Sequence, residues 1–210
     1  MDRRQLLGLG IAGLLPLPAI AATSASRSFR IIRDGSDIGT HTLSATKGPN
    51  GFEIDITIRI AVKLLGITVY RYEMDNRELW TGGNLQNIQS RVNDDGTDDF
   101  VTARRENGKL MVEGSSFTGE APDGIATTSY YNKAFLDRRP WMSTQSGRLL
   151  SISIAEGGPN AYKVSGDLVT TLEYDERGEW INSRFDAGGE AAFYEITRES
   201  GLIGELWASA

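Results

Sequence analysis

The chain has 210 residues with no cysteine and one histidine, and its 22 basic and 28 acidic residues give a formal net charge of −6. This length is typical of one domain with a complete hydrophobic core, and the negative charge disfavours nucleic acid and anionic lipid as partners. The composition also excludes disulfides, thiol catalysis, thiolate metal sites and any metal site built from two or more histidines.

The first residues carry a glycine pattern that does not make a nucleotide site. Gly8, Gly10 and Gly13 match the letters of the dinucleotide-binding fingerprint. That site needs a strand before the first glycine, a helix behind it, and an acidic residue about 20 residues later. Only seven residues precede Gly8, so no strand can deliver the chain to such a turn.

The same segment predicts an export signal over residues 1–21. A charged start leads into the apolar run 6–20, which closes on a small-x-small sequence of the kind that signal peptidases cleave. The Arg3-Arg4 pair favours the twin-arginine route, with the general secretory route as the alternative. A retained membrane anchor is disfavoured, because about 15 apolar residues are short for a span of roughly 20. Cleavage after Ala21 removes two basic residues and one acidic residue, leaving a periplasmic chain with a net charge of −7.

Behind a polar leader over residues 22–28, alternating apolar and polar residues predict a single β domain over 29–198, followed by a C-terminal tail over 199–210. Turn residues, chiefly Gly, Asn and Asp, separate the strands. The predicted strands cover residues 28–33, 38–46, 52–64, 67–74, 77–80, 85–92, 100–106, 109–114, 149–155, 162–166, 168–174, 179–186 and 191–197.

The segment from Phe52 to Leu64 is the longest of these strands. Its apolar residues share one parity and most of its polar residues fall on the other, so one face is buried and the other faces water. At roughly 3.3 Å per residue it would span about 43 Å, far beyond a typical strand, so it has to bend. We expect Gly66 to form a kink or bulge in a curved sheet.

Two turns carry specific expectations. Asn107-Gly108 predicts a two-residue hairpin turn of type I′, which needs a positive φ at both positions. The acidic segment 93–99 has the carboxylate density of a calcium loop, but it lacks the 12-residue pattern and the closing glutamate. A solvated hairpin turn is therefore favoured there.

Residues 122–143 form the least strand-like part of the chain and are rich in aromatic side chains. Within them, residues 132–138 are compatible with a short helix. Because no second hydrophobic core and no linker is evident, we interpret the segment as a crossover or plug inside one domain. The predicted fold is mainly β: a single curved antiparallel sheet, or half-open β-barrel, with a short helix or loop covering its concave face.

The sequence offers little catalytic chemistry. His41 lies in a predicted strand with no serine or aspartate signature beside it, so a packed or surface side chain is favoured over a general base. The carboxylates are scattered, and residues 22–210 contain no nucleophile elbow, phosphate loop or zinc-binding helix motif. We therefore predict no catalytic residue, no metal and no cofactor.

Aromatic residues are the best candidates for binding a ligand. Tyr and Trp combine an apolar body with a polar tip, which suits the wall of a small-molecule pocket, although core packing is their commoner role. The candidate ligand-binding residues are Tyr70, Arg71, Tyr72, Trp80, Trp141 and Trp180.

The stretch Leu64-Leu65-Gly66-Ile67-Thr68-Val69-Tyr70-Arg71-Tyr72-Glu73 resembles a bacterial exported family that is known only as a domain of unknown function. Further matching segments follow the family's order, and the resemblance covers nearly the whole chain after residue 21: 34–40, 78–80, 141–147 and 174–180. It implies no activity and no catalytic residue. The pattern is also similar to that of periplasmic lipoprotein carriers, whose half-barrels wrap a short helical element beside an apolar cavity. That likeness concerns architecture, which does not assign a function.

Three functional hypotheses follow from these observations. The first is an exported, periplasmic, non-enzymatic binding or carrier module for an apolar or amphipathic small ligand, with no membrane anchor after cleavage. The second is a structural or assembly factor of the cell envelope that binds a protein partner through a sheet edge or an apolar patch. An enzyme is the third and least favoured reading, since it needs polar groups that converge in a pocket.

Overall fold

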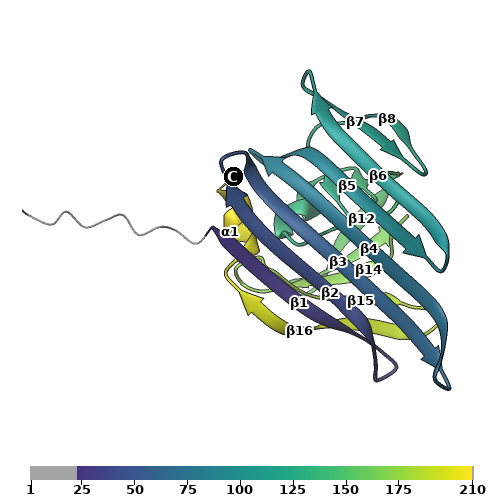
Figure 1. Cartoon of the computed structure of the whole chain (residues 1–210). Coiled ribbons are helices and arrows are strands. Elements are labelled where there is room, and N and C mark those ends of the chain that lie inside the picture. Colours follow the sequence, from purple (N-terminus) through teal and green to yellow (C-terminus); the bar gives the residue numbers. More distant parts are fainter. Residues whose placement is uncertain (1–22, 210) are drawn as a thin grey trace, which may run out of the picture.

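Thirteen strands form one large antiparallel sheet in the computed structural model, which describes residues 23–209 (Figure 1). They are β1 (Ser24–Arg33), β2 (Ser36–Gly48), β3 (Gly51–Leu64), β4 (Ile67–Thr81), β5 (Asn84–Asp94), β6 (Thr97–Glu106), β7 (Lys109–Gly114), β8 (Thr118–Ala121), β12 (Ile152–Gly158), β13 (Ala161–Gly166), β14 (Thr170–Tyr174), β15 (Trp180–Asp186) and β16 (Ala191–Ser200). Their order is β12-β13-β14-β15-β16-β1-β2-β3-β4-β5-β6-β7-β8, so every neighbouring pair except β16 and β1 is consecutive in the chain.

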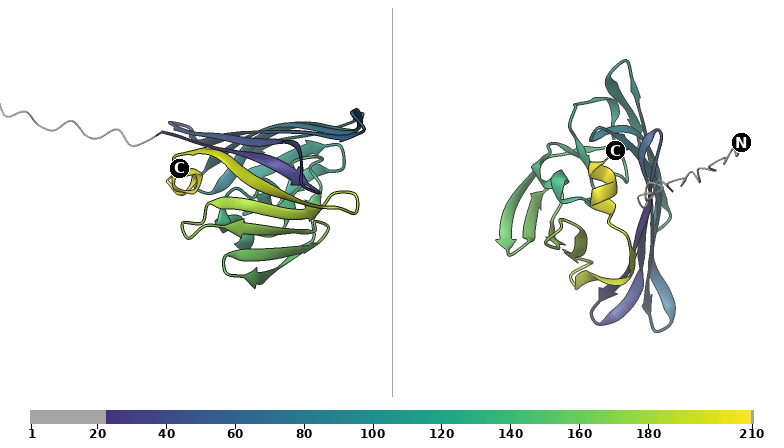
Figure 2. Two further views of the ribbon diagram at one scale, coloured as in Figure 1. Left: turned by 90° about the horizontal axis from the view of Figure 1, so that it is seen from below. Right: turned by 90° about the vertical axis from the view of Figure 1, so that its left-hand side faces the viewer.

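The predicted fold class is confirmed. The sheet is antiparallel throughout and stays open, because its edge strands β8 and β12 each have a single neighbour. Figure 2 shows how the sheet curves, so that the strands from β12 to β15 face those from β1 to β5 across the interior. The predicted signal over residues 1–21 lies outside the described residues. β1 begins at Ser24, inside the segment that the sequence predicted to be a polar leader.

The long strand predicted from Phe52 is present as β3, and its inward-facing side chains are buried in alternation. β3 pairs with β4 from Phe52↔Trp80 to Leu64↔Ile67. The prediction of a kink or bulge at Gly66 is wrong. Leu65 and Gly66 have φ values of 51° and 84° and form the hairpin turn between these strands. Residues 67–81 then run as one strand, β4, where the sequence predicted two.

Both turn predictions are confirmed. Asn107 and Gly108 have φ values of 51° and 84°, as a type I′ turn between β6 and β7 requires. The acidic segment 93–99 also forms a hairpin turn, in which Asn93 Nδ2 donates to Asp98 Oδ1 at 2.6 Å. This contact ties up one of the carboxylates that a calcium ion would need.

The plug predicted over residues 122–143 is present on the concave face of the sheet and extends to residue 150. They hold a small three-stranded sheet of β9 (Ala126–Thr127), β10 (Trp141–Met142) and β11 (Leu149–Leu150). The predicted short helix is a 3₁₀ helix, η1 (Lys133–Asp137), whose N-cap Asn132 accepts a hydrogen bond from the Ala134 amide at 2.9 Å.

Aromatic side chains fill the space between the plug and the sheet. The ring of Phe135, from η1, lies 5.2 Å from the ring of Trp80 and 5.0 Å from that of Tyr131. Trp207 packs against Phe135 from the other side at 5.8 Å. All four side chains are buried, so this half of the interior is a solid hydrophobic core.

The predicted C-terminal tail contains a short helix, α1 (Ile203–Ala208), that lies between the sheet and the plug (Figure 2). Its first amides, from Ile203 and Gly204, donate to the carboxylate of Glu179 at 3.1 and 2.6 Å. Glu179 is itself buried, 3.6 Å from the Arg27 guanidinium. A side chain 24 residues away therefore caps this helix, which local sequence patterns cannot reveal.

No helix in residues 23–209 combines the length and the apolar character needed to cross a membrane.

Candidate functional site

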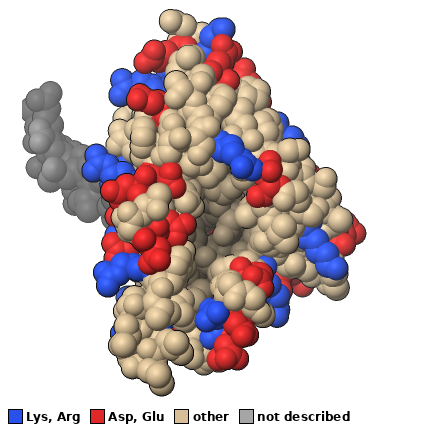
Figure 3. Space-filling model, turned by 90° about the vertical axis from the view of Figure 1, so that its right-hand side faces the viewer, with Lys and Arg blue, Asp and Glu red and all other residues tan. Residues whose placement is uncertain are grey.

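The concave face is only partly filled by the plug, and a cavity of about 480 Å³ remains. It lies between β3 and β4 on one side and the loops of the plug on the other, close to the ends of the sheet where the β1–β2, β3–β4 and β5–β6 turns lie. Figure 3 faces this end of the molecule and shows a hollow at its centre, with acidic and basic side chains around the rim. The cavity is therefore open to solvent at one end.

One wall of the cavity is apolar because of the alternation in β3. Exposure of its inward-facing residues rises along the strand, from 0% at Ile54 through 1% at Ile56 to 9% at Ile58. Ile60 is partly exposed. The plug covers the start of this row and leaves the rest facing open space. Leu168 and Phe185 extend the apolar wall from the opposite layer of the sheet.

The other wall is polar and comes from two loops of the plug. The hydroxyls of Thr128 and Thr144 lie 2.9 Å apart, and the Thr144 amide donates to Thr128 Oγ1 at 3.0 Å. Gln145 donates through Nε2 to Asp99 Oδ2 at 3.1 Å, which fixes this loop to β6. An ion pair of 2.6 Å between Arg148 and Asp167 lies at the edge of the same wall. The cavity therefore has one face for hydrocarbon and one for hydrogen bonds.

His41 is the most unusual residue in the wall. Its side chain is 2% exposed, and neither ring nitrogen has a hydrogen-bond partner among the described residues. The rings of Phe29, Trp180 and Tyr194 surround it at 6.1, 5.1 and 5.4 Å. Burial lowers the pKa of His41 to about 3, so the imidazole is neutral at physiological pH. A neutral imidazole carries one N–H donor and one acceptor, and both are buried without a partner among the described residues.

Tyr130 carries backbone strain beside His41. Its φ of 35° places a bulky side chain in the left-handed region, which such residues rarely occupy. Its carbonyl accepts a hydrogen bond from the Tyr174 hydroxyl at 2.8 Å, and its ring lies 5.1 Å from that of Trp180. Strain of this kind is held by its surroundings and is concentrated at functional sites.

The six candidate ligand-binding residues do not lie together. Tyr70 and Tyr72 line the cavity: the Tyr70 hydroxyl donates to Asp94 at 2.8 Å, and the Tyr72 hydroxyl makes only a weak contact with Met74 Sδ at 3.7 Å. Arg71 points to the outer face, where it pairs with Glu73 at 3.4 Å. Trp80, Trp141 and Trp180 are 0 to 1% exposed and pack in the core.

Sequence patterns missed most of the cavity wall. His41 was assigned a structural role, and the polar plug residues carried no motif. The only sequence feature that could have indicated them is that residues 122–143 lack the alternation of a strand and are flanked by serine and threonine residues. The cavity exists because the plug stops short of the open end, which depends on contacts distant in sequence.

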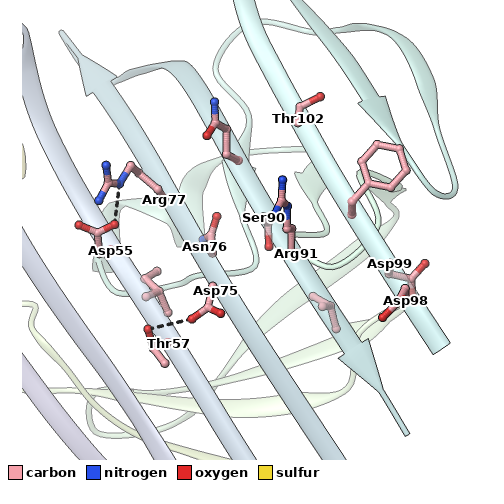
Figure 4. A pocket seen from close by; sticks show the side chains of 14 residues that line it. Asp55, Thr57, Asp75, Asn76, Arg77, Ser90, Arg91, Asp98, Asp99 and Thr102 are labelled. Carbon is pink, nitrogen blue, oxygen red and sulfur yellow. Dashed lines mark hydrogen bonds and ion pairs between the residues drawn. The ribbon is translucent and has the colours of Figure 1, made fainter. Parts of the chain in front are cut away.

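A second groove lies on the outer face of the sheet across β3 to β6 (Figure 4). Two pairs of its polar side chains satisfy each other: Arg77 Nε donates to Asp55 at 2.6 Å, and Thr57 Oγ1 donates to Asp75 at 3.3 Å. These groups are exposed and paired, so their attraction for a further ligand is small.

Glu78, like Glu179, is a buried carboxyl group outside the cavity wall. It accepts hydrogen bonds from Asn76 Nδ2, Trp80 Nε1 and Thr127 Oγ1 at 2.9, 2.9 and 3.3 Å, and from the Ser129 hydroxyl. Burial raises its pKa. Its donors come from β4 and from the plug, so Glu78 fastens the plug to the sheet.

Among residues 23–209, no group of three or more His, Asp or Glu side chains is arranged to hold a metal ion.

One protein family and two solved structures are similar to this chain. The model of the family described as "Domain of unknown function (DUF6134)" matches residues 29–197. A solved beta-barrel-like protein of the domain of unknown function DUF1849 from Brucella abortus has a similar structure, with a TM-score of 0.56 and 9% identity over 87% of this chain and 99% of that chain. A DUF1089 family protein from Pseudomonas aeruginosa gives a TM-score of 0.40 and 14% identity over 82% and 94% of the two chains. No curated protein matches the chain. The DUF1849 likeness supports the fold alone.

Proposed function

This chain belongs to the DUF6134 family of unknown function, and on that premise we propose that it is a non-enzymatic binding or carrier protein for an amphipathic small molecule. The ligand occupies the cavity on the concave face, with its hydrocarbon part against β3 and its polar end against the plug. The observation that carries the proposal is His41, a buried imidazole in the cavity wall whose two nitrogens have no partner.

The size and character of the cavity support this proposal. A volume of about 480 Å³ lies within the range of small-molecule sites, which is roughly 300–1,000 Å³. Such sites are mostly apolar and contain a few polar groups at defined positions. The cavity has this character: Ile58, Ile60 and Phe185 form an apolar wall, and Thr128 and Thr144 lie on the polar wall.

His41 indicates the chemistry of the ligand's polar end. A buried polar group without a partner costs about 1–3 kcal/mol, which a hydrogen bond from a ligand would recover. The imidazole is neutral, and the guanidinium of Arg148 is already paired with Asp167. We therefore expect an uncharged head that both donates and accepts hydrogen bonds, such as a hydroxyl or an amide.

The proposal is tested by measuring binding of the uncharged fluorescent amphipath N-phenyl-1-naphthylamine to the purified protein and by native mass spectrometry of co-purified molecules. Ile60→Trp fills the cavity and is expected to weaken binding by tenfold or more, a loss of about 1.4 kcal/mol. Thr57→Trp places the same ring on the outer face of the same strand and serves as the matched control. Equal binding by both variants would contradict the proposal.

We further propose that the chain is exported and acts in the periplasm. The support is the sequence of residues 1–21 alone. Cell fractionation together with N-terminal sequencing tests it, with a mature N-terminus at Ala22 as the expected result. Replacement of both Arg3 and Arg4 by lysine blocks export only if the twin-arginine route is used.

A further inference from the structure

The hairpin of β3 and β4 extends beyond the rest of the sheet as a two-stranded arm. The pairing of β2 with β3 ends at Gly39↔Ile60, and that of β4 with β5 ends at Tyr72↔Asp94. Residues 61–70 therefore pair with no strand outside their own hairpin, as the projecting turn at the lower right of Figure 1 shows. An isolated two-stranded hairpin is marginally stable, so its sequence is expected to be polar unless something covers it.

The arm ends instead in apolar side chains. Leu64, Leu65, Ile67 and Val69 are 64%, 95%, 70% and 52% exposed, which makes them four of the eight large hydrophobic side chains exposed in the described residues. Leu65 stands at the turn with a φ of 51°, where glycine or asparagine is the ordinary choice. An exposed leucine at a position that disfavours it contributes nothing to folding, which indicates that the tip contacts another surface.

The arm borders the entrance of the ligand cavity. An apolar hollow of about 740 Å³ is lined by Val62, Leu64 and Val69 of the arm, and it shares Ile60, Tyr70 and Phe185 with the cavity wall. Apolar surface therefore continues from the tip of the arm to the inside of the cavity. A molecule that enters at the tip would keep contact with apolar side chains along this path.

We propose that the tip of this arm docks on a lipid surface of zwitterionic or neutral headgroups, by inserting Leu64, Leu65 and Ile67 among the acyl chains. The inference deepens the proposed function, because it names the source of the amphipathic ligand, and it rests on that function only for this purpose. Lys63 and Tyr70 lie directly behind the tip, where a snorkelling amine and an aromatic ring suit the headgroup layer.

Size and charge decide between a lipid surface and a protein partner. A stable protein interface buries about 800 Å² on each side, and a tip of four side chains at the end of a narrow hairpin cannot supply this area. The neighbouring β1–β2 and β5–β6 hairpin ends carry four carboxylates, Asp34, Asp37, Asp94 and Asp95, against one guanidinium, Arg33, so on balance they repel anionic headgroups. Shallow insertion needs only a few apolar side chains, so the tip fits a lipid surface of low negative charge.

The test is flotation of the full chain with vesicles of pure phosphatidylcholine and of phosphatidylcholine mixed with phosphatidylglycerol. We expect binding to the first and weaker binding to the second. The double variant Leu65→Asp with Ile67→Asp should lose about tenfold or more in partitioning. Met111→Asp, at an exposed apolar side chain of β7, is the matched control and should bind as the unaltered protein does. In a separate variant, Ile67→Trp should show a blue shift and quenching by brominated acyl chains.

The outcomes separate this inference from the proposed function. If the double variant loses vesicle binding but still takes up the fluorescent amphipath, both stand. If the unaltered chain binds the amphipath but no vesicle, docking is overturned and the cavity function is kept. If the double variant instead converts a dimer into a monomer in analytical ultracentrifugation, a second copy covers the tip and the lipid proposal is wrong. Equal loss in Met111→Asp would also overturn it.

Discussion

The ring of His41 lies 5.1 Å from the ring of Trp180, and this contact shields an imidazole without hydrogen-bond partners from water. Trp180 is itself anchored, because its Nε1 donates to the Asn182 carbonyl at 2.8 Å and its own carbonyl accepts from Arg27 at 2.6 Å. The sequence predicted that Trp180 contacts a ligand. Trp180 instead packs against His41, the residue that we propose binds the ligand.

Stability should fall in mild acid because of His41. Burial lowers its pKa from 6.5 to about 3, so the unfolded chain binds a proton more readily than the folded chain. The stabilisation is fully present above pH 6.5 and is lost as the pH falls toward 3. Between pH 7 and pH 4.5 we expect this residue to account for a loss of about 2–3 kcal/mol in the free energy of unfolding.

The measurement is urea denaturation at both pH values for the unaltered chain and for His41→Phe. Phenylalanine keeps the aromatic packing and cannot be protonated, so the variant should lose less stability on acidification. Identical losses in the two proteins would show that His41 does not cause the acid sensitivity.

Removal of one donor to Glu78 should loosen the plug. Ser129→Ala deletes a hydroxyl that bonds this buried carboxyl group, and we expect a loss of about 1–2 kcal/mol in stability. Ser165→Ala, at an exposed serine of β13, should change stability by less than about 0.5 kcal/mol. Denaturation curves of the two variants with equal midpoints would refute the bracing role of Glu78.

The C-terminal helix should contribute measurably to folding. Leu206 is 8% exposed and packs in the core, so Leu206→Ala is expected to cost about 2–3 kcal/mol. Glu205→Ala changes the exposed neighbour on the same helix and should be nearly neutral. Thermal unfolding of both variants checks this, and a neutral Leu206→Ala would mean that α1 is dispensable.

Leu65 should be a position where stability and binding oppose each other. Asparagine tolerates the left-handed backbone better than leucine, so Leu65→Asn is expected to stabilise the chain by about 0.5–1 kcal/mol while reducing its binding to phosphatidylcholine vesicles. Denaturation and flotation of the same preparation measure both quantities. Weaker binding accompanied by weaker folding would indicate a structural role for this leucine.

The sheet could be predicted from the sequence because its strands obey a local rule. Alternation from Phe52 to Leu64 and the turn at Asn107-Gly108 report which residues share a face and where the chain reverses. Gly66 was misread because a glycine inside an apolar run has the same appearance at a bulge and at a hairpin turn.

The cavity could not be predicted, because alternation does not say what packs on the inner face. Ile54 and Ile60 have the same parity on the same strand, yet the first is sealed by the plug and the second faces open space. The capping of α1 by Glu179 and the isolation of His41 likewise depend on residues far apart in the chain. The six aromatic and basic candidates were therefore a mixture of wall, surface and core positions.

We expect the pairing of β16 with β1 to limit how quickly the protein folds. Every other neighbouring pair in the large sheet is a local connection, whereas this pair joins Arg27 to Glu199 across almost the whole described chain. Two meanders, β1 to β8 and β12 to β16, can each form early, but the shared interior closes only when this distant contact is made. Contacts between residues far apart in the sequence form slowly, so we expect the two meanders to form quickly and the pairing of β16 with β1 to form slowly afterwards. A circular permutant that links the ends at this seam and opens the chain in the crossover should refold faster with the same final structure.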